Sequence, residues 1–192
     1  DVKLIHYKDQ MHYICNRGIN AHKIEVEMGT IDENGLCKSN ILKLENQNSI
    51  EKNWVLFHHK SEDVLHFVYN WYPLQVGKLL DDSEKDATRT YNTFIYERHD
   101  TPRLFSQVRG STNCVYVDNE LWFLCHIVSY ENMRFYYHLF VVLDANKNYQ
   151  LKKYSSLFTF DKCPIEYTTG FVYDDHKKQF MIGYSTNDNT TK

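Results

Sequence analysis

The sequence predicts an all-β fold in which one antiparallel unit of strands is repeated along the chain. Aromatic residues are abundant, with 15 Tyr and 11 Phe against only 7 Gly in 192 residues, as is typical of strands that pack a core. Helical periodicity is almost absent. A hairpin pattern recurs instead, with a spacing of about 50 to 60 residues, and such a period indicates a repeat architecture.

Four hairpins carry this repeat. Each consists of a strand, a polar turn and a second strand with an apolar or aromatic centre, and together they cover residues 4–16, 54–70, 111–126 and 168–185. Their turns contain the short polar residues that tight turns favour, at Lys8-Asp9, Ser61-Glu62-Asp63, Asp118-Asn119 and Asp174-Asp175.

Further strand-like runs follow two of the hairpins. Residues 22–31 and 40–46 follow the first, and residues 136–144 and 148–160 follow the third. A unit of four antiparallel strands is a blade of a β-propeller, so the sequence predicts a propeller whose fourth unit ends after its hairpin. Residues 81–107 are charged and rich in turn formers, and we expect them to form a loop-rich outer edge of the second unit. A β-sandwich or a meandering antiparallel sheet is the alternative.

Composition and charge argue against several classes of partner. The net charge is −3 and no block of basic residues is present, which argues against nucleic acid or an anionic membrane as a main partner. No apolar run approaches the ~20 residues of a membrane helix. The five Cys form no CxxC pair, so we expect buried thiols in a reducing, cytoplasmic compartment. The histidines lack the spacing of zinc ligands, so neither a metal site nor a cofactor is predicted.

Polar residues gather just before and just after the hairpins. In a propeller the innermost strand of each blade lines a central channel, so these positions are expected to converge from distant parts of the sequence. Those before or early in the hairpins are Asp1, Lys3, Glu51, Lys52, Asn53, Arg109, Ser111, Asn113, Glu166 and Tyr167. Those at the ends of the second strands are Asn16, Asn70, His126, Asn187 and Asp188. The plain alternative is that strands begin and end at the surface, where polar residues belong.

These residue types suit a sugar ligand, because sugars are polyols with apolar faces. Cleavage of a glycosidic bond needs an acid that protonates the leaving oxygen, together with a second carboxylate or an activated water. The predicted catalytic residues are Asp1 and Glu51, and Glu166 and Asp188 are further carboxylates. Stacking surfaces are predicted at Trp54, Tyr69, Trp71 and Tyr137, and groups that bind an anion such as phosphate at Lys52, Arg109 and His126.

Several segments resemble a known family of five-bladed propeller enzymes, the β-mannoside phosphorylases and mannosidases. The opening D-V-K-L is similar to that family's E-D-P-R segment, and LWFLCHIVS resembles its strand ending in Y-H-G-V. YYHLFVVLD resembles the strand after it, and IEYTTGFVYDD with QFMIGYSTND resembles the closing segment. EKNWVLF falls where the family carries a lysine-bearing segment. The same fold serves β-fructosidases and arabinanases.

The resemblance implies a five-bladed propeller of which this chain, as a single domain over residues 1–192, holds about four blades. We therefore expect a first blade to precede Asp1. The resemblance also implies a general acid at Asp1 and sugar or phosphate contacts from Lys52, His126 and Asp188. The chain departs from the family at Val2 and Lys3, where the family has proline and arginine. It also departs at Asn70, where phosphorylases carry an arginine.

Two functions follow as hypotheses. The first is an enzyme that cleaves or forms a glycosidic bond with inverting chemistry and a carboxylic general acid, as a glycosidase or a glycosyltransferase. Its substrate is expected to be mannoside-like, with a nucleotide sugar or phosphate as a further candidate partner. Phosphorolysis is disfavoured because an amide at Asn70 cannot supply a charged fork to phosphate. The second is a non-catalytic propeller that binds glycans.

Overall fold

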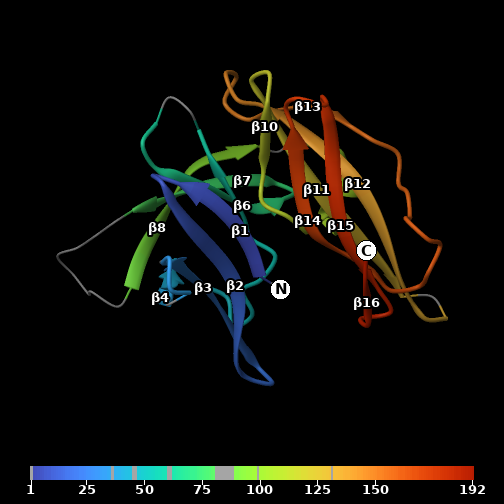
Figure 1. The fold of residues 1–192 in the computed structure, drawn as a ribbon, viewed down its shortest axis with the longest axis horizontal. Coiled ribbons are helices and arrows are strands. Elements are labelled where there is room, and N and C mark those ends of the chain that lie inside the picture. Colours follow the sequence, from blue (N-terminus) through green and yellow to red (C-terminus); the bar gives the residue numbers. More distant parts are fainter. Residues whose placement is uncertain are drawn as a thin grey trace. The chain divides into compact units, whose positions relative to one another are not determined.

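A computed structural model describes residues 2–35, 37–44, 47–59, 62–80, 89–98, 100–130 and 132–192 (Figure 1). The described residues are predominantly in antiparallel β-strands, and they include no α-helix. The chain divides into two compact units. The first comprises residues 1–70 and 74–98, and the second comprises residues 71–73 and 99–192.

The first unit contains two four-stranded meanders. The first meander consists of β1 (Val2–Tyr7), β2 (Gln10–Asn20), β3 (Lys23–Ile31) and β4 (Cys37–Lys43). The second consists of β5 (Val55–His58), β6 (Leu65–Trp71), β7 (Leu74–Leu80) and β8 (Arg89–Arg98). Strands β4 and β8 pair in parallel, so the sheet runs in the order β1-β2-β3-β4-β8-β7-β6-β5.

The second unit contains two smaller sheets. The first is formed by β9 (Arg109–Gly110), β10 (Val115–Val117), β11 (Glu120–Tyr130), β12 (Arg134–Asp144) and β13 (Gln150–Tyr154), and β9 pairs with β11. The second is formed by β14 (Glu166–Asp174), β15 (Gln179–Thr186) and β16 (Thr190–Thr191). A short 3-10 helix, η1 (Arg103–Gln107), precedes β9.

The turns explain why these strands pair as they do. Lys8 and Asp9, with φ of 48° and 56°, and Asp118 and Asn119, with φ of 48° and 63°, are left-handed pairs in two-residue hairpin loops. Two consecutive left-handed residues form the type of turn whose twist matches that of the flanking strands. Both turns coincide with turns that the sequence predicts.

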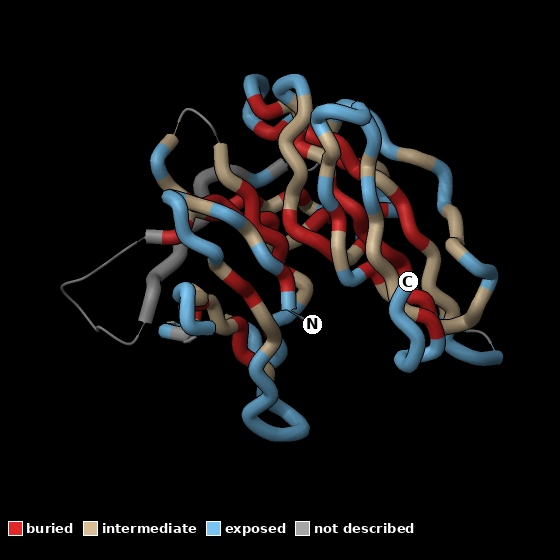
Figure 2. Tube along the Cα trace, in the orientation of Figure 1, coloured by how far each residue is buried: buried red, intermediate tan, exposed pale blue. Residues whose placement is uncertain are grey.

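Each unit has its own apolar core, and Figure 2 shows burial concentrated in the strands while several hairpin tips are exposed. In the first unit the core includes Ile14, Leu42 and Phe67, with Trp54 stacked on Phe67 at a ring-centroid distance of 4.9 Å. In the second unit Phe123 of β11 is fully buried, and its ring meets that of Trp71 edge-on at 5.3 Å. These cores hold the strands that carry the polar side chains described below.

The structure confirms an all-β fold of repeated antiparallel meanders and corrects three details. Residues 89–98, expected in a loop-rich edge, form the regular strand β8, whereas residues 81–88 lie outside the described residues. His126, expected at a strand end, lies well inside β11, because the strand continues to Tyr130 in register with β12. The fourth repeat does not stop after its hairpin but continues into β16. The arrangement of the meanders as propeller blades stays a prediction.

No helix in the described ranges has the length and apolar character needed to cross a bilayer. Cys15, Cys114, Cys125 and Cys163 carry free thiols. The cytoplasmic location stays a prediction.

Candidate functional site

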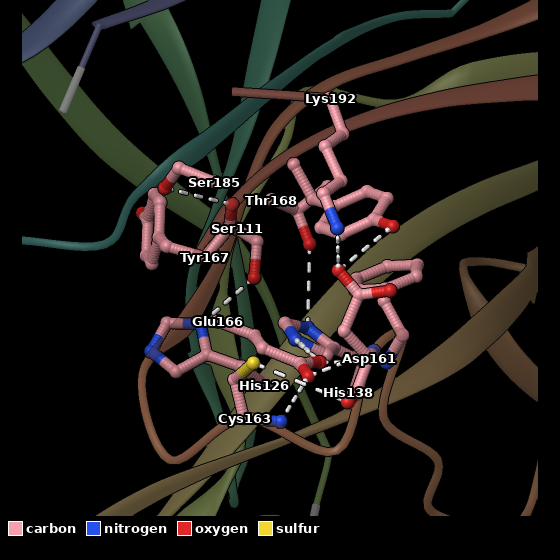
Figure 3. A network of polar contacts seen from close by, with 12 residues as sticks. Ser111, His126, His138, Asp161, Cys163, Glu166, Tyr167, Thr168, Ser185 and Lys192 are labelled. Atoms are coloured by element: carbon pink, nitrogen blue, oxygen red, sulfur yellow. Dashed lines mark hydrogen bonds and ion pairs between the residues drawn. The ribbon is translucent and has the colours of Figure 1, made fainter. Parts of the chain in front are cut away.

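A buried serine–histidine pair lies in the second unit (Figure 3). Ser111 Oγ is 2.8 Å from His126 Nδ1, and the two residues are only 2% and 3% exposed. The pair forms because the short strand β9 places Arg109 opposite His126 of β11. The backbone N–H groups of Ser111 and Thr112 then donate to the carbonyl of Leu124 at 3.1 and 3.3 Å, which fixes the segment beside the ring.

Two tyrosine rings flank this pair. The centroids of Tyr136 on β12 and Tyr167 on β14 each lie 5.5 Å from that of His126, and the two tyrosine rings meet edge-on at 6.3 Å. The Tyr167 hydroxyl is buried and has no hydrogen-bond partner among the described residues. Burial raises the pKa of Tyr167 further above its ordinary value, so the hydroxyl stays neutral and keeps both its donor and its acceptor.

A charged pair extends the site toward solvent. The Arg134 guanidinium lies 5.4 Å from the centroid of the Tyr136 ring, and its Nη2 is 3.7 Å from Asp188 Oδ2. Asp188 sits in the left-handed turn that it forms with Asn187, whose N–H donates to the Ile165 carbonyl at 2.7 Å. Both charged side chains are substantially exposed. We use the name His126 cluster for the contiguous set Ser111, His126, Arg134, Tyr136, Tyr167 and Asp188.

Glu166 is fully buried next to this cluster and organises a loop (Figure 3). Its carboxylate accepts hydrogen bonds from the backbone N–H groups of Phe160, Asp161 and Cys163 at 2.6, 2.9 and 2.8 Å. These bonds fold the segment before β14 around the carboxylate. The geometry gives Glu166 a structural role, and its predicted contact with a substrate stays a prediction.

His138 lies beside Glu166 as a neutral side chain. Burial lowers the pKa of His138 to about 4, although the nearby Glu166 carboxylate acts in the opposite direction. Its Nδ1 is 3.3 Å from Thr168 Oγ1, whereas its Nε2 is 4.0 Å from Glu166 Oε2, which is beyond hydrogen-bond distance. We therefore interpret the contact with Glu166 as proximity of a neutral ring to a carboxylate.

In the first unit, Glu51 occupies a buried network before β5. Its carboxylate accepts hydrogen bonds from the Asn48 backbone N–H at 2.8 Å, the Tyr69 hydroxyl at 3.1 Å and Trp54 Nε1 at 3.2 Å. Burial, with the Glu51 charge as a further cause, raises the pKa of Tyr69 to about 12. Asn53 follows in the left-handed region with φ of 64°, a conformation that Asn tolerates better than most residues. The segment is thus a hydrogen-bonded corner that holds polar groups inside the protein.

The structure brings together only part of the predicted set. Ser111, His126, Tyr167 and Asp188 belong to one cluster, and Glu51 is hydrogen-bonded to Tyr69. Among the other predicted residues, Lys52 is exposed, Asn53 and Arg109 are half-buried, and Lys3 and Asn113 are buried. Burial lowers the pKa of Lys3 to about 8. Asp1 lies outside the described residues. Convergence of residues from the two units stays a prediction.

The sequence patterns missed Arg134 and Tyr136 as members of the cluster. Tyr137 was expected to offer a stacking surface, whereas its neighbour Tyr136 contacts His126. The register of the β11–β12 hairpin would have identified Tyr136. It pairs His126 with His138 and Val128 with Tyr136. Side chains two residues apart share a face, so Tyr136 lies on the diagonal from His126. Within the described part of the chain, no group of His, Cys, Asp and Glu could hold a metal ion.

Comparisons with known proteins identify a shared fold. Neither a protein-family model nor a curated protein matches this sequence. A glycosyl hydrolase from Bacteroides ovatus is similar in structure, with a TM-score of 0.68 and 10% identity over 100% of this chain and 62% of that protein. An endo-arabinase from Bacteroides thetaiotaomicron is also similar in structure, with a TM-score of 0.55 and 13% identity over 99% of this chain and 71% of the endo-arabinase chain. The chain thus spans about three fifths of the first of these proteins, and it shares their fold.

Proposed function

We propose that this chain is part of a carbohydrate-active enzyme of the glycoside hydrolase type, and that the His126 cluster contacts its sugar substrate. The observation that carries the proposal is the cluster itself, in which an oriented histidine, two tyrosines and an arginine–carboxylate pair are contiguous. The fold shared with a glycosyl hydrolase and an endo-arabinase supports the same class of function. We propose, in keeping with the resemblance, that the meanders are blades of a five-bladed propeller.

The chemistry of the cluster matches the two kinds of surface that a sugar presents. The tyrosine rings offer apolar faces for the C–H groups of a pyranose, and their hydroxyls bond to its oxygens. Ser111 fixes the orientation of the His126 ring by bonding to Nδ1. Arg134 and Asp188 supply a donor fork and an acceptor, which together can bind adjacent hydroxyls. Binding of a neutral polyol is therefore the function that these groups perform best.

The proposed reaction transfers the sugar to water with inversion: Asp1 acts as the general acid that protonates the leaving oxygen, and a second carboxylate accepts a proton from the attacking water. The proposed substrate is a β-mannoside. Asn70, at the position where phosphorylases carry an arginine, supports water rather than phosphate as the acceptor. A sugar hydroxyl is the acceptor in the related transfer reaction.

A non-catalytic glycan-binding protein is the second candidate, and one observation favours it. Of the four predicted carboxylates, Glu51 and Glu166 each accept three hydrogen bonds from their own protein. A carboxylate engaged in this way maintains local structure, so the case for catalysis depends on Asp1 and Asp188. The two candidates share the His126 cluster and differ in whether Asp1 acts as an acid.

An activity screen of the full-length protein separates these functions. Release of reducing sugar is measured from a panel of β-mannosides, arabinans and other glycans, with and without phosphate, for the wild type and Asp1→Asn. Phosphate-independent release that the Asp1→Asn variant loses supports the hydrolase. Glycan binding without release, equal in both proteins, supports the binding protein. Absence of both binding and release across the panel contradicts the proposal.

A further inference from the structure

A pocket lies wholly within the first unit. It has a volume of about 620 Å³ and lies between the β1–β2 turn, strands β3 and β4, and the start of β6. This volume is in the range of small-molecule binding sites, which are typically about 300–1,000 Å³. The pocket shares no residue with the His126 cluster.

The register of the sheet explains how polar groups come to line this pocket. His12 of β2 pairs with Thr30 of β3, which pairs in turn with Lys38 of β4, so the three residues form one row across adjacent strands. Asn40 lies two residues beyond Lys38 and therefore on the same face of the strand. All four residues line the pocket. An imidazole, a hydroxyl and an ammonium thus lie side by side on three neighbouring strands, and an amide lies two residues farther along the third strand.

The base of the pocket is apolar and the charges at its edge are unbalanced. Met28, Leu65 and Leu79 line it, and the two leucines are almost fully buried. The Lys8 ammonium is neutralised by Asp63 at 2.8 Å, whereas Lys38 has no ion-pair partner among the described residues. Burial lowers the pKa of His12, so its ring is neutral at pH 7; its N–H bonds to the Tyr7 backbone, and its other nitrogen can accept a hydrogen bond. One uncompensated positive charge therefore faces a pocket of neutral polar groups.

We propose that this pocket binds a carboxylated sugar, a uronic acid, with the carboxylate at Lys38 and the ring hydroxyls at Thr30, His12 and Asn40. Met28 and Leu65 contact the C–H face of the sugar. A simple anion would leave the apolar base and the amide unused, and a neutral sugar would leave the Lys38 charge unused. The proposal stands on the pocket alone and does not depend on hydrolytic activity.

The test is an NMR titration of the full-length protein with sodium galacturonate, galactose, acetate and a galacturonate trimer as separate probes. Galacturonate is expected to shift the amide signals of the pocket residues and to bind about tenfold or more tightly than galactose or acetate, because the charged hydrogen bond and the polyol contacts add. If the trimer binds more tightly than free galacturonate, the ligand is a uronic acid within a polysaccharide chain. If the trimer binds more weakly, the ligand is the free uronic acid.

Two variants of the exposed Lys38 make the test specific. Lys38→Gln and Lys38→Glu are expected to weaken galacturonate binding about tenfold and to leave galactose binding unchanged. Lys177→Gln, at an exposed lysine of the second unit that does not line the pocket, is the matched control and should bind as the wild type does. Equal affinities for galacturonate and galactose, equal affinities for galacturonate and acetate, or unchanged galacturonate binding in Lys38→Glu would each overturn the proposal.

Discussion

Neighbouring residues on β14 illustrate two opposite uses of a buried polar group. The Glu166 carboxylate is saturated by backbone donors, whereas the Tyr167 hydroxyl has no hydrogen-bond partner among the described residues. A satisfied buried group stabilises the fold, and an unsatisfied one costs stability unless a ligand or water completes it. Glu166 therefore serves the fold, whereas the Tyr167 hydroxyl remains available to a ligand.

Replacement of Tyr167 by Phe should leave stability unchanged or raise it slightly, by up to about 1 kcal/mol, since no protein hydrogen bond is lost. Affinity for the glycan substrate should fall about tenfold, because the hydroxyl can no longer bond to the sugar. Urea unfolding measures the first quantity and calorimetric titration the second. Strong destabilisation with unchanged glycan affinity would assign the hydroxyl a structural role instead.

Replacement of Glu166 by Gln should destabilise the protein by about 2–4 kcal/mol. The amide nitrogen of Gln would face backbone N–H groups that now donate to a carboxylate oxygen, which leaves buried donors unpaired. Urea unfolding is the measurement, and Asp175→Asn, at an exposed turn position, is the control with the same change of charge and chemistry. Equal stability of the two variants would show that the loop before β14 does not depend on Glu166.

At the scale of the strands, local patterns predict hairpins well and long-range pairing poorly. The turns at Lys8-Asp9 and Asp118-Asn119 contain the polar residues that tight turns favour, so these hairpins could be predicted from the sequence. The parallel pairing of β4 with β8 joins residues that are distant in the chain, and no local periodicity encodes it. Likewise Ser111 and His126 were predicted site residues, but Arg134 and Tyr136 entered only through the register of β11 with β12.

Gly29 of β3 provides a prediction about strand packing. A Cβ at this position would collide with the Lys38 carbonyl oxygen and would lie 2.7 Å from the Tyr13 ring. Gly29→Ala should therefore destabilise the protein by about 1–3 kcal/mol, since backbone must move. A methyl group at Gly18 would meet no atom of another segment within 4 Å, so Gly18→Ala should be nearly neutral. Similar urea midpoints for the two variants would contradict this account of the β3–β4 packing.

A buried histidine on one strand of each unit makes stability depend on pH. Burial lowers the pKa of His66 on β6 and of His138 on β12 from 6.5 to about 4. Between these values the unfolded chain binds more protons than the folded protein, so the free energy of unfolding decreases as the pH falls from about 6.5 to about 4. Above pH 6.5 each histidine is neutral in both the folded and the unfolded protein, so it takes nothing from the free energy of unfolding.

His138→Gln tests this pH dependence. The variant should lose up to about 3 kcal/mol less stability than the wild type between pH 7 and pH 4, because a shift of one pKa unit corresponds to about 1.4 kcal/mol. Urea unfolding at both pH values gives the comparison, and His176→Gln, in an exposed turn, is the control. Identical pH profiles for His138→Gln and the wild type would show that His138 is not held neutral in the folded protein.

For the whole molecule, the central claim is that the His126 cluster binds the sugar substrate of a carbohydrate-active enzyme. The most direct measurement is a crystal structure of the full-length protein, with the proposed acid replaced as Asp1→Asn, in complex with a bound glycan. The account predicts a sugar ring packed against Tyr136 or Tyr167, with His126 and Arg134 within hydrogen-bond distance of its oxygens. An ordered glycan bound elsewhere, with no sugar atom in contact with the cluster, would contradict it.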